Sequence, residues 1–129
     1  MSNRTRGDYL EHQTRDALAQ YGWLVIRSGG SLGCADLVAL RVGKRPLLVQ
    51  CKILGKGRQM PRVDPAERMA LFTAARESGA RAIIATRYRG GFVALLELPG
   101  PHWTTYPMVD ELHVPARPGK GKADAEETI

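Results

Sequence analysis

The chain has 129 residues, 43% of them hydrophobic and 25% charged, which is the composition of one soluble globular domain large enough to bury a core. No apolar run approaches the roughly twenty residues of a membrane helix, and no signal peptide precedes the first predicted helix. We therefore expect a cytoplasmic protein with no membrane partner. The formal net charge of +6 favours a polyanionic partner.

The N-terminal half predicts one helix followed by three strands. Residues 1–7 are polar and basic and are expected to form a flexible arm. Apolar residues recur at helical spacing over Asp8–Tyr21, which predicts a helix that ends at Gly22. The glycine-rich segment 28–33 is expected to be a loop, and residues 43–45 a hairpin turn. Three runs rich in apolar and β-branched residues are the predicted strands: Trp23–Arg27, Asp36–Val42 and Leu47–Lys52.

The C-terminal half predicts a basic loop, a second helix and two further strands. Residues 54–63 contain glycines and basic residues with few apolar anchors and are expected to form a mobile loop. Asp64 as N-cap, Pro65 at the first helical position and Glu67 at the third begin a helix. That helix runs to about Ser78 and ends at Gly79. The last two predicted strands are Ala82–Thr86 and Phe92–Leu98.

The order of these elements predicts the fold class. Because a helix connects the third and fourth strands, these strands are expected to be parallel neighbours. We predict an α/β fold with a central mixed sheet of about five strands flanked by helices, in one domain over residues 1–115. Residues 116–129 are expected to form a disordered tail. Residues 102–115 allow no assignment, although Trp103 and Tyr106 are expected to pack on the sheet or on a partner.

Basic residues are concentrated in one part of the predicted domain. The segment from residue 41 to residue 62 contains no acidic residue and seven basic ones: Arg41, Lys44, Arg45, Lys52, Lys56, Arg58 and Arg62. A basic stripe of this kind is typical of phosphate binding. The alternative is that these charges serve solubility alone.

The cysteines and histidines do not indicate a metal site. Cys34 and Cys51 lack the spacing of zinc ligands and are predicted to be reduced thiols used as small buried residues. The histidines, which share no ligand spacing either, are His12, His102 and His113.

A cluster of polar residues is predicted at one end of the central hairpin. Alternation along the third strand puts Gln50 and Lys52 on one face and Cys51 on the other. A hairpin turn of two or three residues sets Asp36 opposite Cys51 or Lys52. Asp36, Gln50 and Lys52 are therefore expected to lie together.

Glu11 is the fourth member that we consider for this cluster. On a helical wheel it lies beside Leu18, at the edge of the apolar stripe that faces the sheet. The alternative is a capping box, because Asp8 and Glu11 also have the spacing of an N-cap and its partner.

These residue types suit a magnesium site. Mg²⁺ prefers oxygen ligands, and Glu11, Asp36 and the Gln50 amide oxygen could supply them. A bound metal would activate a water, and Lys52 could stabilise the charge on a phosphate or help to deprotonate that water. The alternative is a surface aspartate and an edge-strand lysine with no shared task, since Asp-x13-Gln-x-Lys is a loose pattern.

Several short motifs occur in an order that is more specific than any of them alone. They are Arg6-Gly7-x-x-x-Glu11, Gly22, Arg27-Ser28-Gly29-Gly30-Ser31, Asp36-Leu37-Val38-Ala39 and Leu48-Val49-Gln50-Cys51-Lys52. With these motifs, roughly residues 4 to 98 resemble the archaeal-type Holliday junction resolvases of the PD-(D/E)xK nuclease superfamily. The resemblance implies a restriction-endonuclease-like fold and dependence on Mg²⁺, with Mn²⁺ as a substitute. It also implies a homodimer that nicks two opposing strands of a four-way DNA junction.

The resemblance also assigns roles to individual residues. Lys52 would be the catalytic lysine, Ser31 a loop serine needed for activity, and Arg27 would lie close to the scissile phosphate. The metal would be held by Glu11, Asp36, Gln50 and the backbone carbonyl of Cys51. The expected DNA-binding residues are Arg4, Arg6, Arg27, Ser28, Lys56, Arg58 and Arg62. For the loop that starts at Ser28, backbone contact with a phosphate and plain flexibility are both open.

Gln50 departs from the pattern, because the family usually has glutamate there. An amide keeps a ligand oxygen but removes a negative charge, so the affinity for metal should fall. Two other functions therefore stay open: another PD-(D/E)xK nuclease of repair, exonuclease or restriction type, and a junction-binding protein without catalysis. A cytoplasmic location in a prokaryotic cell or a phage-infected host fits all three.

Overall fold

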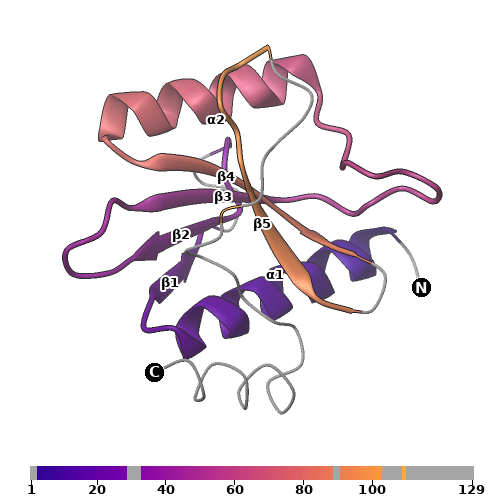
Figure 1. The fold of residues 1–129 in the computed structure, drawn as a ribbon, viewed down its shortest axis with the longest axis horizontal. Helices are drawn as coiled ribbons and strands as arrows, with labels where there is room; N and C mark the ends of the chain where they lie inside the picture. Colours follow the sequence, from indigo (N-terminus) through magenta and orange to yellow (C-terminus); the bar gives the residue numbers. More distant parts are fainter. Residues whose placement is uncertain (1–2, 29–32, 89–90, 103–108, 110–129) are drawn as a thin grey trace.

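The computed structural model describes residues 3–28, 33–88, 91–102 and 109. Its elements follow the predicted order of one helix, three strands, one helix and two strands (Figure 1). Their bounds are α1 Asn3–Gln20, β1 Leu24–Arg27, β2 Leu37–Leu40, β3 Leu47–Cys51, α2 Pro65–Ser78, β4 Arg81–Arg87 and β5 Val93–Glu97. The predicted tail, 116–129, and the predicted packing of Trp103 and Tyr106 lie outside the described residues.

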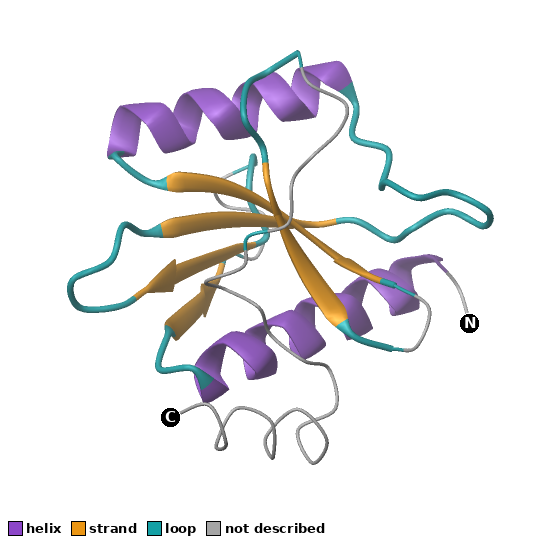
Figure 2. Ribbon diagram, viewed as in Figure 1, coloured by secondary structure: helices purple, strands orange, loops and turns teal. Residues whose placement is uncertain are grey.

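The five strands form one mixed sheet in the order β1-β2-β3-β4-β5. β3 and β4 are parallel, with Leu47 opposite Arg81, and the other neighbours are antiparallel. The predicted parallel pair is thus confirmed, and α2 is the crossover between its strands. Figure 2 shows α2 over one face of the sheet and α1 over the other.

Each helix buries a separate apolar cluster against its face of the sheet. Leu18 of α1 and Val49 of β3 are fully buried on one side. Leu71 of α2 and Ile84 of β4 are fully buried on the other. Each such side chain contributes roughly 1.5–3 kcal/mol by leaving water. β3 and β4 are apolar on both faces because a helix covers each face at the centre of the sheet.

The first helix begins earlier than the sequence predicts. It starts at Asn3, so a flexible arm over residues 1–7 is wrong for residues 3–7. These residues lack apolar periodicity, but arginine is a good helix former, and the prediction from apolar spacing alone overlooked that. Since Asp8 lies within the helix, the capping-box interpretation of Glu11 is also wrong. The carbonyl oxygen of Asp8 instead lies 2.9 Å from Nδ1 of His12, one turn along.

The second helix begins and ends as predicted. The Asp64 side chain accepts a hydrogen bond of 3.0 Å from the backbone N–H of Ala66, and Pro65 is the first helical residue. Gly79 ends the helix with a φ of 71°, which glycine adopts without a steric penalty. Arg45 donates to the carbonyl oxygens of Gly79 and Ala80 at 3.1 and 2.8 Å. The Arg45 guanidinium therefore has a structural role at this end of the helix.

The β2–β3 hairpin has a longer connection than a two- or three-residue turn. β2 ends at Leu40 and β3 begins at Leu47, and Leu37 pairs with Val49. This register sets Asp36 level with Gln50, not with Cys51 or Lys52, which corrects the predicted pairing. Asp36 still lies at the same end of the hairpin as Gln50 and Lys52, because the observed register differs from the predicted one by only one or two residues.

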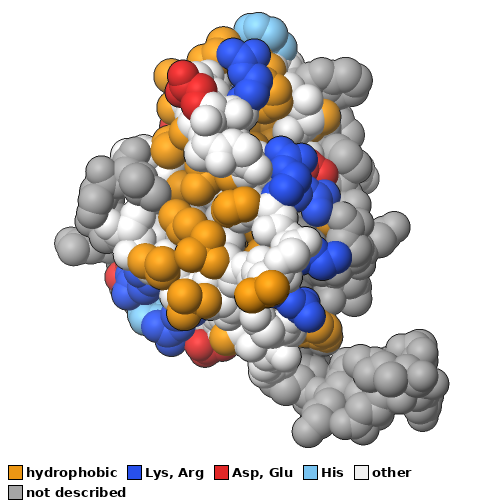
Figure 3. Space-filling model, turned by 90° about the vertical axis from the view of Figure 1, so that its left-hand side faces the viewer, with side chains coloured by type: hydrophobic (Ala, Val, Ile, Leu, Met, Phe, Trp, Pro, Cys, Tyr) orange, Lys and Arg blue, Asp and Glu red, His pale blue; other side chains and the backbone are white. Residues whose placement is uncertain are grey.

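One part of the sheet remains uncovered by either helix. Leu24 and Ile26 of β1 and Leu40 of β2 are 63%, 48% and 37% exposed, and Leu24 pairs with Leu40 across the strands. Figure 3 views this side of the molecule and shows hydrophobic side chains gathered on it, with lysine and arginine side chains along one margin. In the part of the chain that the structure describes, no helix has the length and apolar character needed to span a bilayer.

Candidate active site

The end of the β2–β3 hairpin holds the first predicted carboxylate. Asp36 precedes β2, and its backbone N–H donates to the carbonyl oxygen of Val49 at 2.8 Å. Its carboxylate Oδ2 accepts a hydrogen bond of 2.8 Å from the backbone N–H of Cys51. Two hydrogen bonds to β3 thus fix Asp36 beside the strand that carries Gln50 and Lys52.

Glu11 points from α1 toward the end of β1. Its Oε1 accepts a hydrogen bond of 3.1 Å from Nη2 of Arg27, the last residue of β1. The Glu11 side chain is 20% exposed and that of Arg27 is 41% exposed. Arg27 therefore holds the Glu11 carboxylate while its own guanidinium keeps contact with solvent.

The Cys51 thiol shows that the two carboxylates share one environment. Burial raises the pKa of this thiol above its ordinary value, and the negative charges of Asp36 and Glu11 raise it further. Two groups act in the opposite direction: a contact of 3.8 Å with the hydroxyl of Thr14 and the charge of Arg27. Cys51 is thus a protonated, partly buried thiol, close to the reduced and buried role predicted for it. Cys34 is also free and partly buried.

Gln50 and Lys52 lie on the other face of β3, as strand alternation predicts. Both interact with Glu67 of α2. The Lys52 Nζ lies 2.9 Å from each Glu67 oxygen, and Nε2 of Gln50 donates to Glu67 Oε2 at 3.0 Å. Glu67 was expected only to cap its helix. The one signal in the sequence was a carboxylate in the first turn of the helix that packs on this face.

Two buried oxygens on this face have no hydrogen-bond partner among the described residues. Gln50 is 8% exposed, and its Oε1 is unpartnered. Thr86 is fully buried, and its Oγ1 is also unpartnered. Cys51 pairs with Ala85, so continuing the parallel register sets Thr86 beside Lys52. An unpartnered buried oxygen costs free energy unless another group satisfies it.

The oxygens at this site fit a hard cation. Glu11, Asp36 and Gln50 Oε1 provide two carboxylates and a neutral oxygen, the ligand type that Mg²⁺ prefers. The described residues contain no group of three or more His, Cys, Asp or Glu that could hold a metal. Gln50 is an amide and adds a neutral oxygen to the two carboxylates, not a third acidic group.

The other predicted site residues are placed less completely. Ser31 lies outside the described residues, and Arg4 and Arg6 fall in the first turns of α1. The Ser28 hydroxyl donates to the carbonyl oxygen of Ala35 at 2.6 Å, and its N–H donates to that of Asp36 at 2.9 Å. Ser28 therefore ties the start of the loop to the backbone of Ala35 and Asp36.

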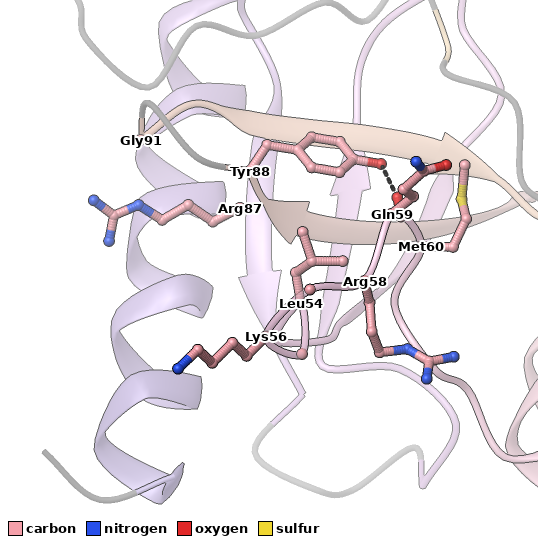
Figure 4. Close-up of a pocket in the computed structure, with 10 residues that line it drawn as sticks. Leu54, Lys56, Arg58, Gln59, Met60, Arg87, Tyr88 and Gly91 are labelled. Carbon is pink, nitrogen blue, oxygen red and sulfur yellow. Dashed lines mark hydrogen bonds between the residues drawn. The ribbon is translucent and has the colours of Figure 1, made fainter.

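The basic stripe of the sequence divides into two groups in space. β3 separates Arg41, Lys44 and Arg45 at one end of the sheet from the loop after Lys52 at the other (Figure 1). That loop lines a groove of about 990 Å³ together with residues after β4. Lys56, Arg58 and Arg87 carry the charges of the groove (Figure 4), and the Tyr88 hydroxyl donates to the Gln59 carbonyl oxygen at 3.2 Å across it. Arg62 lines an adjoining groove with Arg58.

Comparison with known families decides what this arrangement represents. The sequence model of the archaeal Holliday junction resolvase (Hjc) family matches residues 2–107. The chain belongs to this family. An Hjc chain of Archaeoglobus fulgidus, a Holliday junction resolvase from an archaeal hyperthermophile, has the same fold. The two chains superpose with a TM-score of 0.58 at 23% identity, over 84% of this chain and 87% of that chain. No curated protein sequence matched.

Membership of the Hjc family confirms the resemblance found in the sequence and the fold that it implied. The five-stranded mixed sheet with two helices is the restriction-endonuclease-like arrangement of an Hjc protein. Hjc proteins form a family of metal-dependent junction resolvases.

Proposed function

We propose that this chain is a magnesium-dependent DNA endonuclease that resolves four-way junctions by paired symmetric nicks. One observation carries the proposal. In a chain of the Hjc family, Asp36, Gln50 and Lys52 meet at one end of the hairpin, and Glu11 faces the same strand end. Phosphodiester hydrolysis at neutral pH needs such a combination of metal-ligand oxygens and a nearby cation.

Each residue has a distinct part in this proposal. Glu11, Asp36, Gln50 Oε1 and the Cys51 carbonyl would hold Mg²⁺, with Mn²⁺ as a substitute. When bound, the ion would supply a water of lowered pKa and positive charge beside the phosphate. The Lys52 ammonium, 25% exposed, would stabilise negative charge that develops on the phosphate. Arg27, which already contacts the Glu11 carboxylate, would also contact the scissile phosphate. Ser31 would be the loop serine that activity requires.

The DNA backbone would run along the basic loop after Lys52. Lys56, Arg58 and Arg62 are exposed, and two of them line the groove shown in Figure 4. Lysine and arginine bind phosphates irrespective of sequence, which suits a protein that recognises the branched shape of its substrate. Arg4, Arg6 and Ser28 would add contacts from the start of α1 and from the loop after β1.

A second copy of the chain would supply the second nick. A four-way junction has two-fold symmetry, and a C2 dimer of small subunits matches it. The exposed apolar face formed by Leu24, Ile26 and Leu40 is the surface that we assign to this contact. Figure 3 shows basic side chains beside it, where DNA would reach both subunits.

The test is cleavage of a synthetic four-way junction and of the matching linear duplex, with and without Mg²⁺. We expect cleavage of the junction alone, and only with metal. Equal cleavage of the duplex would favour another nuclease of the superfamily.

One observation favours a second candidate, a junction-binding protein without catalysis. Gln50 removes a negative charge from the metal site. Tight binding of the junction without cleavage in either Mg²⁺ or Mn²⁺ would support this second function and exclude the first.

A further inference from the structure

Glu67 has a different role from the one that its position in the helix predicts. At the start of α2, the Asp64 carboxylate accepts the N-cap hydrogen bond from the backbone N–H of Ala66. The Glu67 carboxylate turns instead to β3, where it contacts the Lys52 ammonium and the Gln50 amide. Lys52 and Glu67 are 15 residues apart in sequence, so the contact ties α2 to the end of β3.

The contact also fixes which way the Gln50 amide faces. A carboxylate only accepts hydrogen bonds, so it must face the NH₂ group of the amide and not its oxygen. The Gln50 Oε1 therefore points away from Glu67, and it is buried and without a partner among the described residues. With the amide reversed, two acceptor oxygens would meet at about 3 Å, an arrangement with no proton between them.

We propose that Glu67 is a positioning residue that replaces the charge lost at position 50. The resemblance to the family implies a glutamate at this position, with its charge on β3 beside the lysine. Here the charge comes from α2, where Glu67 balances Lys52, and the neutral Gln50 presents Oε1 to the cation. This inference rests on the proposed function, because it concerns the residues assigned to the metal site.

The inference requires that the charge can be exchanged between the two positions. Gln50→Glu alone would set two carboxylates in contact, and their repulsion would displace one of them. Glu67→Gln alone would leave Lys52 without its anion and the Gln50 amide free to reverse. The double variant, with both substitutions, returns one carboxylate and one amide to the pair.

The experiment compares the natural chain with these three variants. Isothermal titration calorimetry with Mg²⁺ measures metal affinity without DNA. We expect each single variant to bind Mg²⁺ at least about 10-fold more weakly, a difference of about 1.4 kcal/mol. The double variant should recover most of that loss. Glu77→Gln, an exposed change on the same helix, is the control and should bind like the natural chain.

A second readout observes the amide itself. The side-chain NH₂ signals of Gln50 in a ¹H–¹⁵N NMR spectrum should be shifted and slow to exchange in the natural chain, without metal. Glu67→Gln should move both signals and speed their exchange, while Glu77→Gln leaves them unchanged. The inference would be overturned if the losses of Mg²⁺ affinity in the two single variants simply added in the double variant, with no recovery.

The failures of the two proposals can be told apart. If the natural chain binds Mg²⁺ and shows the coupled pattern but never cuts a junction, the proposed function fails and the role of Glu67 stands. If it cuts junctions and Glu67→Gln changes neither Mg²⁺ affinity nor the Gln50 signals, only the inference about Glu67 fails.

Discussion

Lys52 is held at the site by its ion pair with Glu67. Glu67 lies 2.9 Å from the ammonium, and the lysine side chain is 25% exposed. In the proposed site, the Lys52 ammonium is the positive charge of the protein that stabilises the developing charge on the phosphate, so no other side chain would replace it after substitution. We therefore expect Lys52→Ala to lower the single-turnover rate of junction cleavage by about 10²–10³-fold, the size found for loss of one such stabilising group. Gel-shift titration should show junction affinity nearly unchanged.

The matched control is Lys56→Ala, in the loop that follows. It should weaken junction binding and leave the rate at saturating protein intact. If Lys52→Ala behaved in the same way, Lys52 would be a DNA contact and not part of the chemistry.

The buried Cys51 thiol predicts how stability depends on pH. Its pKa is raised, chiefly by burial, so the folded state holds the thiol proton at pH values where the unfolded chain has lost it. The stabilisation is complete below the unfolded pKa and is lost as pH rises above about 8.5. Urea unfolding should show stability falling in this alkaline range, and Cys51→Ala should flatten the decline. Cys34→Ala is the comparison variant. If stability declined as steeply in Cys51→Ala as in the natural chain, the pH dependence would come from other groups.

At the scale of elements, α2 positions the anion of the site. Asp64 caps the helix and lies three residues before Glu67. Asp64→Ala should lower the free energy of unfolding by about 1 kcal/mol, the usual cost of losing an N-cap. The check is the midpoint of chemical denaturation, with Glu77→Gln on the same helix as the control. No change would mean that the cap contributes nothing to α2.

Much of the fold could be predicted because local pattern and tertiary packing agree. Alternation along β3 placed Gln50 and Lys52 on one face, and the helix between β3 and β4 fixed their parallel pairing. The cap of α2 was equally plain, since Asp64, Pro65 and Gly79 each have one dominant backbone role. The start of α1 was missed because polar helical turns have no apolar period.

The site was only partly predictable for a related reason. The Asp36 register depends on the length of the β2–β3 connection, which no local pattern specifies. Glu67 depends on where α2 packs over the sheet, and a residue with a good capping explanation gave no cause to look further. Gln50, by contrast, differs from the glutamate that the resemblance implied, and that difference leads to Glu67 because the structure places the two residues in contact.

At the scale of the whole molecule, our proposal assigns the dimer contact to the uncovered face of β1 and β2. Ile26 is 48% exposed, so Ile26→Glu should cost the single subunit little and should disrupt a dimer that buries this face. Sedimentation velocity should show a dimer for the natural chain and a monomer for this variant. Tyr9→Glu, an exposed change on α1 at the opposite face, is the control and should stay dimeric. A dimeric Ile26→Glu would place the contact elsewhere.

The central claim is that two such sites act together on one branched DNA. The most direct measurement uses a supercoiled plasmid with an extruded cruciform, incubated with the protein and Mg²⁺. Two nicks within one binding event give linear plasmid, whereas a single nick relaxes the circle and removes the cruciform. We predict linear product from the natural chain, open circles from a mixed dimer with one Lys52→Ala subunit, and intact plasmid without metal. Open circles from the natural chain, or cleavage of a plasmid without the cruciform, would contradict the claim.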